Sequence, residues 1–394
     1  MIVSFLNPAV LFCIVWGTAL FLYSLKYSLI LTELKPETVI LVMGSCAGAI
    51  IGWLFTGVTS FKLMINPIQA KAEWTESIRT TLAQRLKYLF FVWIVLSAFE
   101  LFYFGNLPLL SLFGVGETIA YNEYGFSGLH GLLNAIQLVL FNMALLFYIR
   151  RRSVKYIFYV VALIAWSAIL LMRGIIMASF IQGIMVCFLF SKSFRKRFLL
   201  FGSVITFLLV LVFGELGQIR AVGGTSIEVL AQKSSDYPDF LPTGFFWVYV
   251  YITTPLNNLN ANIELTSALG FPYYSFLPLI PNVIKGALNI ENLDLVLVDE
   301  NLNVSSFFRD FIFDYGVYGT MLIVSILYFI FSLAMKKSKN NERWALILVV
   351  ILYCTVTSVF VNAYTGIVYL AQMFLFGAIY YRVSGGIRNQ IRDM

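Results

Sequence analysis

Ten apolar stretches recur along the 394-residue chain, and each comes close to the roughly 20 apolar residues that a membrane-spanning helix requires. Apolar residue types make up 60% of the sequence and charged types 12%, with a mean hydropathy of +0.85, whereas a soluble domain has about a quarter charged residues. No series of segments alternates apolar and polar residues as barrel strands do. The stretches are 3–25, 38–59, 88–107, 128–149, 156–172, 174–190, 198–217, 311–335, 344–362 and 364–381. They predict an all-α, polytopic integral membrane protein, with one transmembrane domain of about ten helices over residues 1–394.

Lysine and arginine residues are concentrated on one side of this predicted topology. Twenty of the 27 lie in segments 60–87, 150–155, 191–197 and 336–343 and in the tail from residue 382, and these alternate with segments poor in basic residues. Because Lys and Arg are enriched in cytoplasmic loops, the basic segments and both termini are predicted to be cytoplasmic. The pI of 9.1 then follows from topology, and no nucleic-acid partner is expected.

The longest segment on the other side covers residues 218–310. Connections longer than about 15 residues usually carry a function or are disordered. This one contains six of the ten prolines and two aromatic runs, at 245–251 and 271–274. Since proline ends helices and fixes turns, the sequence predicts short or re-entrant helices packed on the membrane domain.

Metal and cofactor chemistry find little support in the composition. The chain has one histidine and four cysteines, and the cysteines lie far apart in apolar stretches. Closely spaced Cys and His pairs, which are typical of zinc and redox sites, do not occur. We therefore expect neither a metal nor a cofactor.

Arg173 is the first candidate ligand for an anion. The charge pattern puts it at the outer ends of two predicted spans, where the helix beginning at 174 directs its free N–H groups. A guanidinium group beside a helix N-terminus suits a phosphate. The alternative is an interfacial arginine whose side chain extends toward water.

Arg220 is the second candidate. It follows the predicted span 198–217 and precedes Gly223 and Gly224, where backbone without side chains allows a ligand to approach closely. The alternative is an internal ion pair with Glu215.

Two aspartates and an arginine occur where the long outer segment returns to the membrane. Asp310 and Asp314 are four residues apart and share one helical face, and Arg309 adds a cation at the same boundary. One of the carboxylates could accept a proton from a substrate hydroxyl. Acidic residues at a helix N-terminus are also ordinary caps, so both interpretations remain open.

Glu264 is a further candidate acid, inside the long outer segment. It follows a polar patch that contains Asn257, Asn258 and Asn260. Amides bind sugar hydroxyls and aromatic rings stack on sugar faces, so the patch suits a saccharide. It suits structural turns equally well.

Four motifs, in this order, resemble those of the O-antigen polymerases, the Wzy-type oligosaccharide repeat-unit polymerases. They are Met172-Arg173-Gly174, Gln218-Ile219-Arg220, Tyr251-Ile252-Thr253-Thr254-Pro255, and Asp314-Tyr315-Gly316-Val317-Tyr318-Gly319. The likeness runs mainly over residues 156–335 and includes the long outer loop.

This resemblance implies an enzyme of the bacterial inner membrane that acts at the periplasmic face. It would transfer a growing chain from undecaprenyl pyrophosphate to a new lipid-linked repeat unit, with a polysaccharide chain-length regulator as a further partner. The family's periplasmic arginines serve the pyrophosphate, and that role falls on Arg173 and Arg220, with Arg309 beside them. The acceptor hydroxyl needs at most one carboxylate, for which Asp310, Asp314 and Glu264 are the candidates.

Two related functions compete with this interpretation. A lipid-linked oligosaccharide flippase would be expected to have two related halves and only short outer loops. An O-antigen ligase resembles the polymerases but uses a histidine in its large outer loop, and residues 218–310 contain none. Both alternatives fit this chain less well than a polymerase does.

Overall fold

The computed structural model describes residues 6–57, 76–105, 107–111, 124–126, 128–191, 193–195, 197, 226–266, 268–280, 282–290, 296–339 and 341–381. Within these ranges the regular secondary structure is helical, apart from one isolated antiparallel bridge between Ser28 and Lys233, and turns and irregular segments connect the helices. The helices are α1 (Pro8–Ser24), α2 (Pro36–Leu54), α3 (Glu76–Phe104), α4 (Pro108–Ser111), α5 (Leu129–Arg151), α6 (Val154–Ile169), α7 (Arg173–Phe190), α9 (Ile227–Leu230), α10 (Thr243–Asn262), α11 (Asn282–Ala287), α12 (Phe308–Ser338), α13 (Glu342–Thr357) and α14 (Ile367–Ile379), with single 3-10 turns η5 (Ile263–Leu265), η6 (Leu277–Leu279) and η7 (Glu300–Leu302).

The predicted helical membrane fold is confirmed in its class, while the predicted number of spans is not. Five helices are long and apolar enough to cross a membrane, namely α2, α3, α5, α7 and α12. Three shorter apolar helices, α1, α6 and α14, accompany them. The predicted span 198–217 lies outside the described residues.

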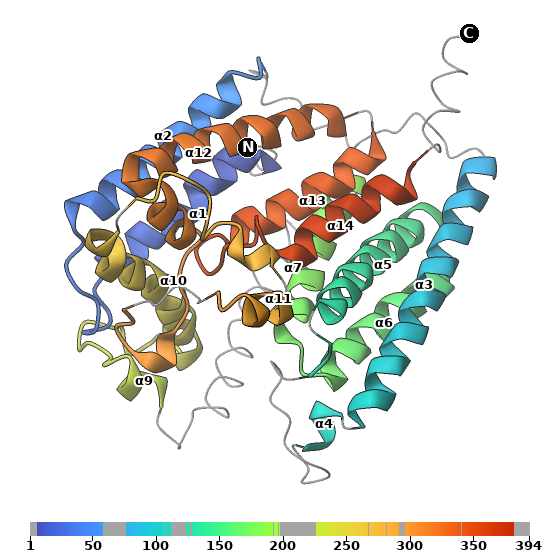
Figure 1. Ribbon diagram of the computed structural model, residues 1–394, viewed down its shortest axis with the longest axis horizontal. Helices are drawn as coiled ribbons and strands as arrows, with labels where there is room; N and C mark the ends of the chain where they lie inside the picture. Colours follow the sequence, from blue (N-terminus) through green and yellow to red (C-terminus); the bar gives the residue numbers. More distant parts are fainter. Residues whose placement is uncertain are drawn as a thin grey trace.

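Among the described helices, α2 and α12 form the most extensive pair, and they lie side by side in Figure 1. Gly44, Gly48 and Gly52 recur every fourth residue on the face of α2 that meets α12. A Cβ atom on Gly48 would lie 3.0 Å from the backbone oxygen of Met321, and one on Gly52 would overlap that of Ser325. Small residues at this spacing let helix backbones approach closely where the hydrophobic effect cannot drive association.

A buried amide network joins three of the apolar helices. Asn142 of α5 donates to Gln182 of α7 over 2.6 Å, and Gln372 of α14 donates to the same oxygen over 2.7 Å. All three side chains are buried. Polar groups in the apolar interior must find partners within the protein, so this network connects α5, α7 and α14 in one arrangement.

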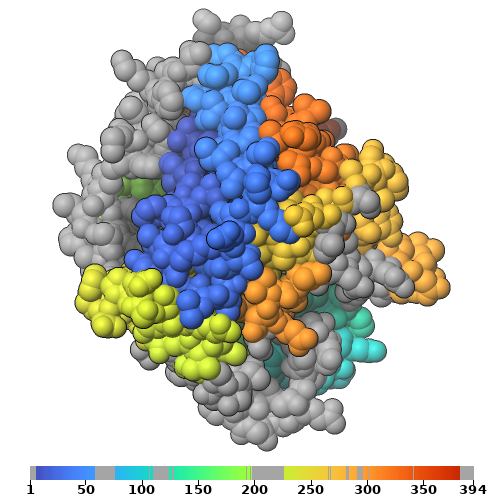
Figure 2. Space-filling model, turned by 90° about the vertical axis from the view of Figure 1, so that its left-hand side faces the viewer, coloured from blue at the N-terminus to red at the C-terminus, as the bar shows by residue number. Residues whose placement is uncertain are grey.

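The described part of the predicted outer loop forms a folded insert between α7 and α12, which we call the insert (residues 226–307 within the ranges given above). Its longest element is α10, which continues through Pro255. The insert packs on the link between α1 and α2, where the backbone N–H of Leu29 donates to Gln232 over 2.9 Å and that of Ser234 donates to Tyr27 over 2.9 Å. Figure 2 shows this contact as yellow-green atoms lying directly below the blue N-terminal helices.

The described basic segments lie at one end of the helical bundle. α9 and α10 lie at one end, whereas the N-terminus of α3 and the C-terminus of α14 lie at the opposite end (Figure 1). At that opposite end Arg85 donates to the carbonyl groups of Ile379 and Tyr381, and Arg150 forms a 2.7 Å ion pair with Glu342. The basic segments that the sequence predicts to be cytoplasmic are thus gathered away from the insert where the structure describes them.

Candidate functional site

Asp310 lies at the start of α12, where the insert ends. The turn that precedes it is attached to the α13–α14 link, since the backbone N–H of Phe307 donates to Ser358 over 2.9 Å. The Asp310 side chain is only 2% exposed. Nε of Arg309 contacts its Oδ1 at 2.6 Å, and Nδ2 of Asn362 donates to its Oδ2 over 2.9 Å. Two chain segments therefore hold this carboxylate in one orientation.

The charge of Asp310 also acts on Lys285 of α11. Burial lowers the pKa of the Lys285 ammonium group, and the negative charge of Asp310 opposes that change. We call Arg309, Asp310, Asn362 and Lys285 the Asp310 cluster. Arg309 and Asp310 are neighbours in the sequence, whereas Lys285 comes from α11 and Asn362 from the α13–α14 link, so the fold completes the cluster.

Two buried polar atoms beside this cluster lack a hydrogen-bond partner among the described residues. They are Oδ1 of Asn362 and Oγ of Ser306, which belongs to the turn preceding α12. Because Nδ2 of Asn362 donates to Asp310, its Oδ1 is left as an acceptor. Buried acceptors usually have a partner. The cluster thus combines a carboxylate, two cations and a spare acceptor, which suits a ligand with hydroxyl and anionic groups.

Asp314 has a different environment from Asp310, although the two are one turn apart. Its carboxylate is fully buried and accepts hydrogen bonds from the backbone N–H groups of Tyr273, Tyr274 and Ser275, and from the Ser275 hydroxyl. The helix kinks just beyond it, at Gly316, where φ is +66°. Asp314 therefore fixes the turn at residues 273–275 of the insert to α12.

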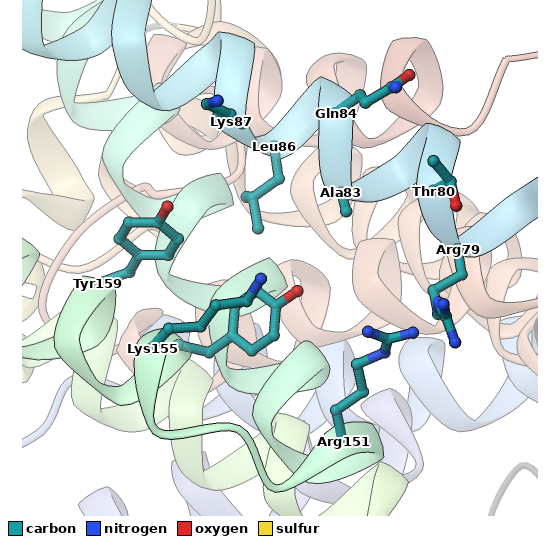
Figure 3. Close-up of a pocket in the computed structure, with 10 residues that line it drawn as sticks. Arg79, Thr80, Ala83, Gln84, Leu86, Lys87, Arg151, Lys155 and Tyr159 are labelled. Atoms are coloured by element: carbon teal, nitrogen blue, oxygen red, sulfur yellow. The ribbon is translucent and has the colours of Figure 1, made fainter. Parts of the chain in front are cut away.

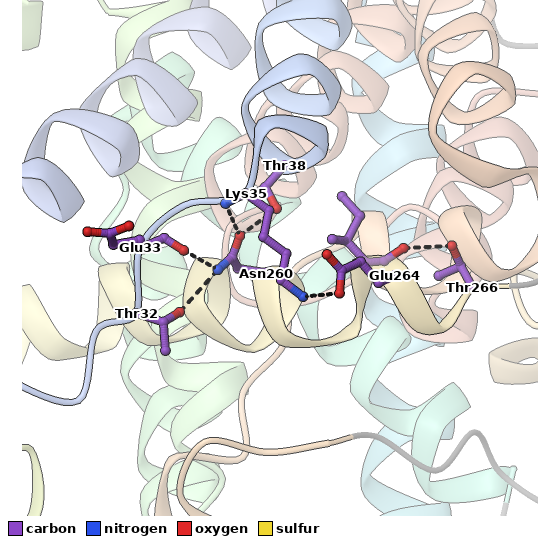
Figure 4. Close-up of polar contacts among 8 residues, drawn as sticks. Thr32, Glu33, Lys35, Thr38, Asn260, Glu264 and Thr266 are labelled. Carbon is purple, nitrogen blue, oxygen red and sulfur yellow. Dashed lines mark hydrogen bonds and ion pairs between the residues drawn. The ribbon is translucent and has the colours of Figure 1, made fainter.

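Glu264 contacts a different part of the chain from Asp310 and Asp314. It forms a 2.8 Å ion pair with Lys35, and its side chain is 62% exposed. Figure 4 shows this pair beside Asn260, which accepts from the Lys35 backbone N–H over 2.8 Å. The structure thus joins Glu264 to the start of α2 and not to the Asp310 cluster.

The asparagines of α10 serve packing. Asn257 and Asn260 bind the α1–α2 link, for example through donation to the carbonyl groups of Ile30 and Glu33 over 2.9 and 2.8 Å. Asn258 donates to the carbonyl of Leu302, on the other side. These side chains are buried, with their amides engaged by the protein itself. The patch does not form the turns that the sequence allowed: it lies within α10, and its amides bind neighbouring segments of the protein.

Arg173 is the first residue of α7, one residue before the predicted start of this helix, and its side chain is exposed. It forms no ion pair with any of the described residues, and no hydrogen bond joins it to the Asp310 cluster within them. Arg220 lies outside the described residues. Both pyrophosphate assignments therefore remain predictions.

One buried acid–histidine pair was not among the predicted sites. Glu100 of α3 contacts Nδ1 of His130 at 2.9 Å and accepts from the backbone N–H of Phe126 over 3.1 Å. Gly125 has a φ of +93°, and a side chain there would overlap the His130 ring. A glutamate within an otherwise apolar stretch was the signal that could have indicated this contact.

Asn362 and Lys285 were also missed, because neither stands out by its sequence neighbours. Asn362 follows an apolar helix, and Lys285 is an isolated lysine in the insert.

Comparison with known proteins finds no matching family model, no matching curated protein and no matching solved structure.

Proposed function

We propose that this protein is a polysaccharide polymerase of the bacterial inner membrane, which joins undecaprenyl-pyrophosphate-linked oligosaccharide repeat units at the periplasmic face. The observation that carries the proposal is the buried Asp310 carboxylate with Arg309, Lys285 and the spare acceptor of Asn362. In this proposal both termini are cytoplasmic and the insert faces the periplasm. The sequence motifs and the uneven distribution of basic residues support the same assignment.

The proposed reaction is the attack of a sugar hydroxyl on the anomeric carbon of the lipid-linked chain. A new glycosidic bond forms, and the bond from the anomeric carbon to the pyrophosphate oxygen breaks. The hydroxyl proton moves to Asp310, and undecaprenyl pyrophosphate leaves with the bonding electrons. Asp310 then returns the proton to solvent.

Proton transfer to Asp310 would also change the charge balance of the cluster. In the resting protein the carboxylate partly neutralises Arg309 and Lys285. Once it is protonated, both cations lose their internal counter-charge just as negative charge develops on the leaving pyrophosphate. Interactions that strengthen only in the transition state raise the rate. Arg173 and Arg220 are proposed to hold the pyrophosphate through bidentate contacts.

The lipopolysaccharide of a strain that lacks this protein tests the proposal directly. A polymerase predicts lipid A core capped with a single repeat unit, and the wild-type gene should restore the full ladder. Uncapped core would contradict the proposal and indicate a flippase or a ligase, since no repeat reaches the core when either of those is missing.

A further inference from the structure

A second polar site lies at the end of the bundle away from the Asp310 cluster. It is a pocket of about 270 Å³ between the start of α3 and the corner where α5 passes into α6. Arg79 and Lys87 line it from α3, Arg151 from α5 and Lys155 from α6. Figure 3 shows Arg79 and Arg151 extended toward one another, with Lys155 reaching between the helices. The proposed polymerase reaction makes no use of this pocket.

Positive charge in the pocket is poorly compensated. None of the described residues that line it is acidic. Arg79 forms an ion pair with Glu76, and Lys155 lies over the Tyr156 ring at 4.9 Å. Arg151 forms no ion pair with a described residue. Like charges held close together repel unless an anion lies between them, so the pocket is suited to a negatively charged ligand.

Aromatic rings close the space between α3 and α6 beyond the pocket. Phe90 contacts Tyr159 with ring centroids 4.6 Å apart, and Trp93 meets Trp166 at 5.9 Å. Aromatic rings between α3 and α6 therefore form the inner wall of the pocket. Its polar wall also carries the Gln84 amide, which can add a hydrogen bond to a bound oxyanion.

Apolar side chains continue outward from the same helices. On α3, Tyr88 and Phe91 are 72% and 64% exposed, and on α6 Phe158 and Val161 are 69% and 56% exposed. In a helical membrane protein such side chains face lipid. A ligand that meets both surfaces has an anionic head and apolar chains.

We propose that this pocket binds the phosphate-bearing headgroup of an anionic phospholipid, with its acyl chains along the exposed faces of α3 and α6. Arg79 and Arg151 can each present two N–H groups to the phosphate oxygens, while Lys87 and Lys155 act as point charges. A soluble phosphate compound shares the head chemistry but would gain nothing from the apolar faces.

Binding is measured with the full-length protein in phosphatidylcholine vesicles that contain increasing fractions of brominated phosphatidylglycerol. Bromine quenches tryptophan fluorescence at short range, and Trp93 and Trp166 lie behind the pocket. For wild type we expect saturable quenching that weakens with added salt. The Arg151→Gln/Lys155→Gln variant should need about 30-fold more brominated lipid for half-saturation, since each basic residue near a membrane surface contributes about 1 kcal/mol and the pair therefore about 2 kcal/mol.

The matched control is Lys337→Gln/Arg343→Gln, which removes two cations that lie over the Trp344 ring, outside the pocket. Its half-saturation should stay within about twofold of wild type, given the screening of separated surface charges. If the double pocket variant fails to fold, Lys155→Gln alone should raise half-saturation about fivefold.

Three results would overturn the proposal. The first is equal loss of binding in the pocket and control variants, which would indicate general surface charge. The second is wild-type quenching in the folded pocket variant. The third is displacement of the lipid by soluble glycerol phosphate at millimolar concentration, which would assign the pocket to a soluble phosphate compound instead.

Discussion

The amide of Asn362 donates a 2.9 Å hydrogen bond to the Asp310 carboxylate, although the two residues are 52 positions apart in the chain. The bond connects the start of α12 to the link between α13 and α14. Asn362 binds Oδ2 of Asp310, and this leaves Oδ1 to contact the Arg309 side chain. The orientation of the proposed base thus depends on packing between distant segments.

Asp310→Asn should abolish most of the polymerase activity. The amide keeps the size of the side chain but cannot accept a proton from the acceptor hydroxyl, and removal of a general base usually costs about 10²-fold or more. The measurement is chain elongation by purified protein with a lipid-linked repeat unit. Turnover at the wild-type rate would remove Asp310 from the mechanism and direct attention to Glu264 or to a reaction without a base.

Asp314→Asn should act mainly on stability, which makes it a matched control on the same helix. The new NH₂ group would face the N–H groups of the turn at 273–275, so at least one buried donor would lose its acceptor. An unsatisfied buried group costs about 1–3 kcal/mol. Thermal unfolding in detergent checks this. An unchanged midpoint together with lost turnover would instead favour Asp314 as the base.

Arg173 and Arg220 should be required as arginines. Alanine at either position should abolish the lipopolysaccharide ladder without lowering the amount of protein, and lysine should leave a clearly shortened ladder, because an ammonium group cannot bind phosphate in the bidentate manner. Normal ladders from both alanine variants would contradict the pyrophosphate assignment.

The membrane topology can be tested with reporters at two lysines. We expect a reporter fused at Lys233, in the insert, to respond as periplasmic, and one fused at Lys339, after α12, to respond as cytoplasmic. The expectation rests on the enrichment of Lys and Arg in cytoplasmic segments. A cytoplasmic response at Lys233 would reverse the proposed orientation.

The sequence predicted the apolar helices well, because long apolar runs such as those of α5 and α12 have few other stable structures in a membrane. It placed Arg173 at a helix start and Asp310 where the long loop ends. It could not predict that Asn362 meets Asp310, because spacing along the chain does not reveal which helices become neighbours. The sequence also could not predict that Asp310 and Asp314 have different environments, because the difference depends on the turn at 273–275, which binds Asp314.

The contact between α2 and α12 gives a last prediction, on stability alone. Gly52→Ala would place a methyl group against the backbone oxygen of Ser325, so the helices must move apart. Overpacking of this kind typically costs about 1–3 kcal/mol.

Gly17→Ala is the matched control, because a side chain at that position in α1 meets nothing within 4 Å. There the same substitution should be neutral or stabilising by up to about 1 kcal/mol, through the higher helix propensity of alanine. Thermal unfolding of both variants in the same detergent makes the comparison. If α2 packs closely on α12, the unfolding midpoint of Gly52→Ala should fall, while that of Gly17→Ala should stay unchanged or rise. Equal midpoints for the two variants would mean that the glycine face of α2 does not set the distance between these helices.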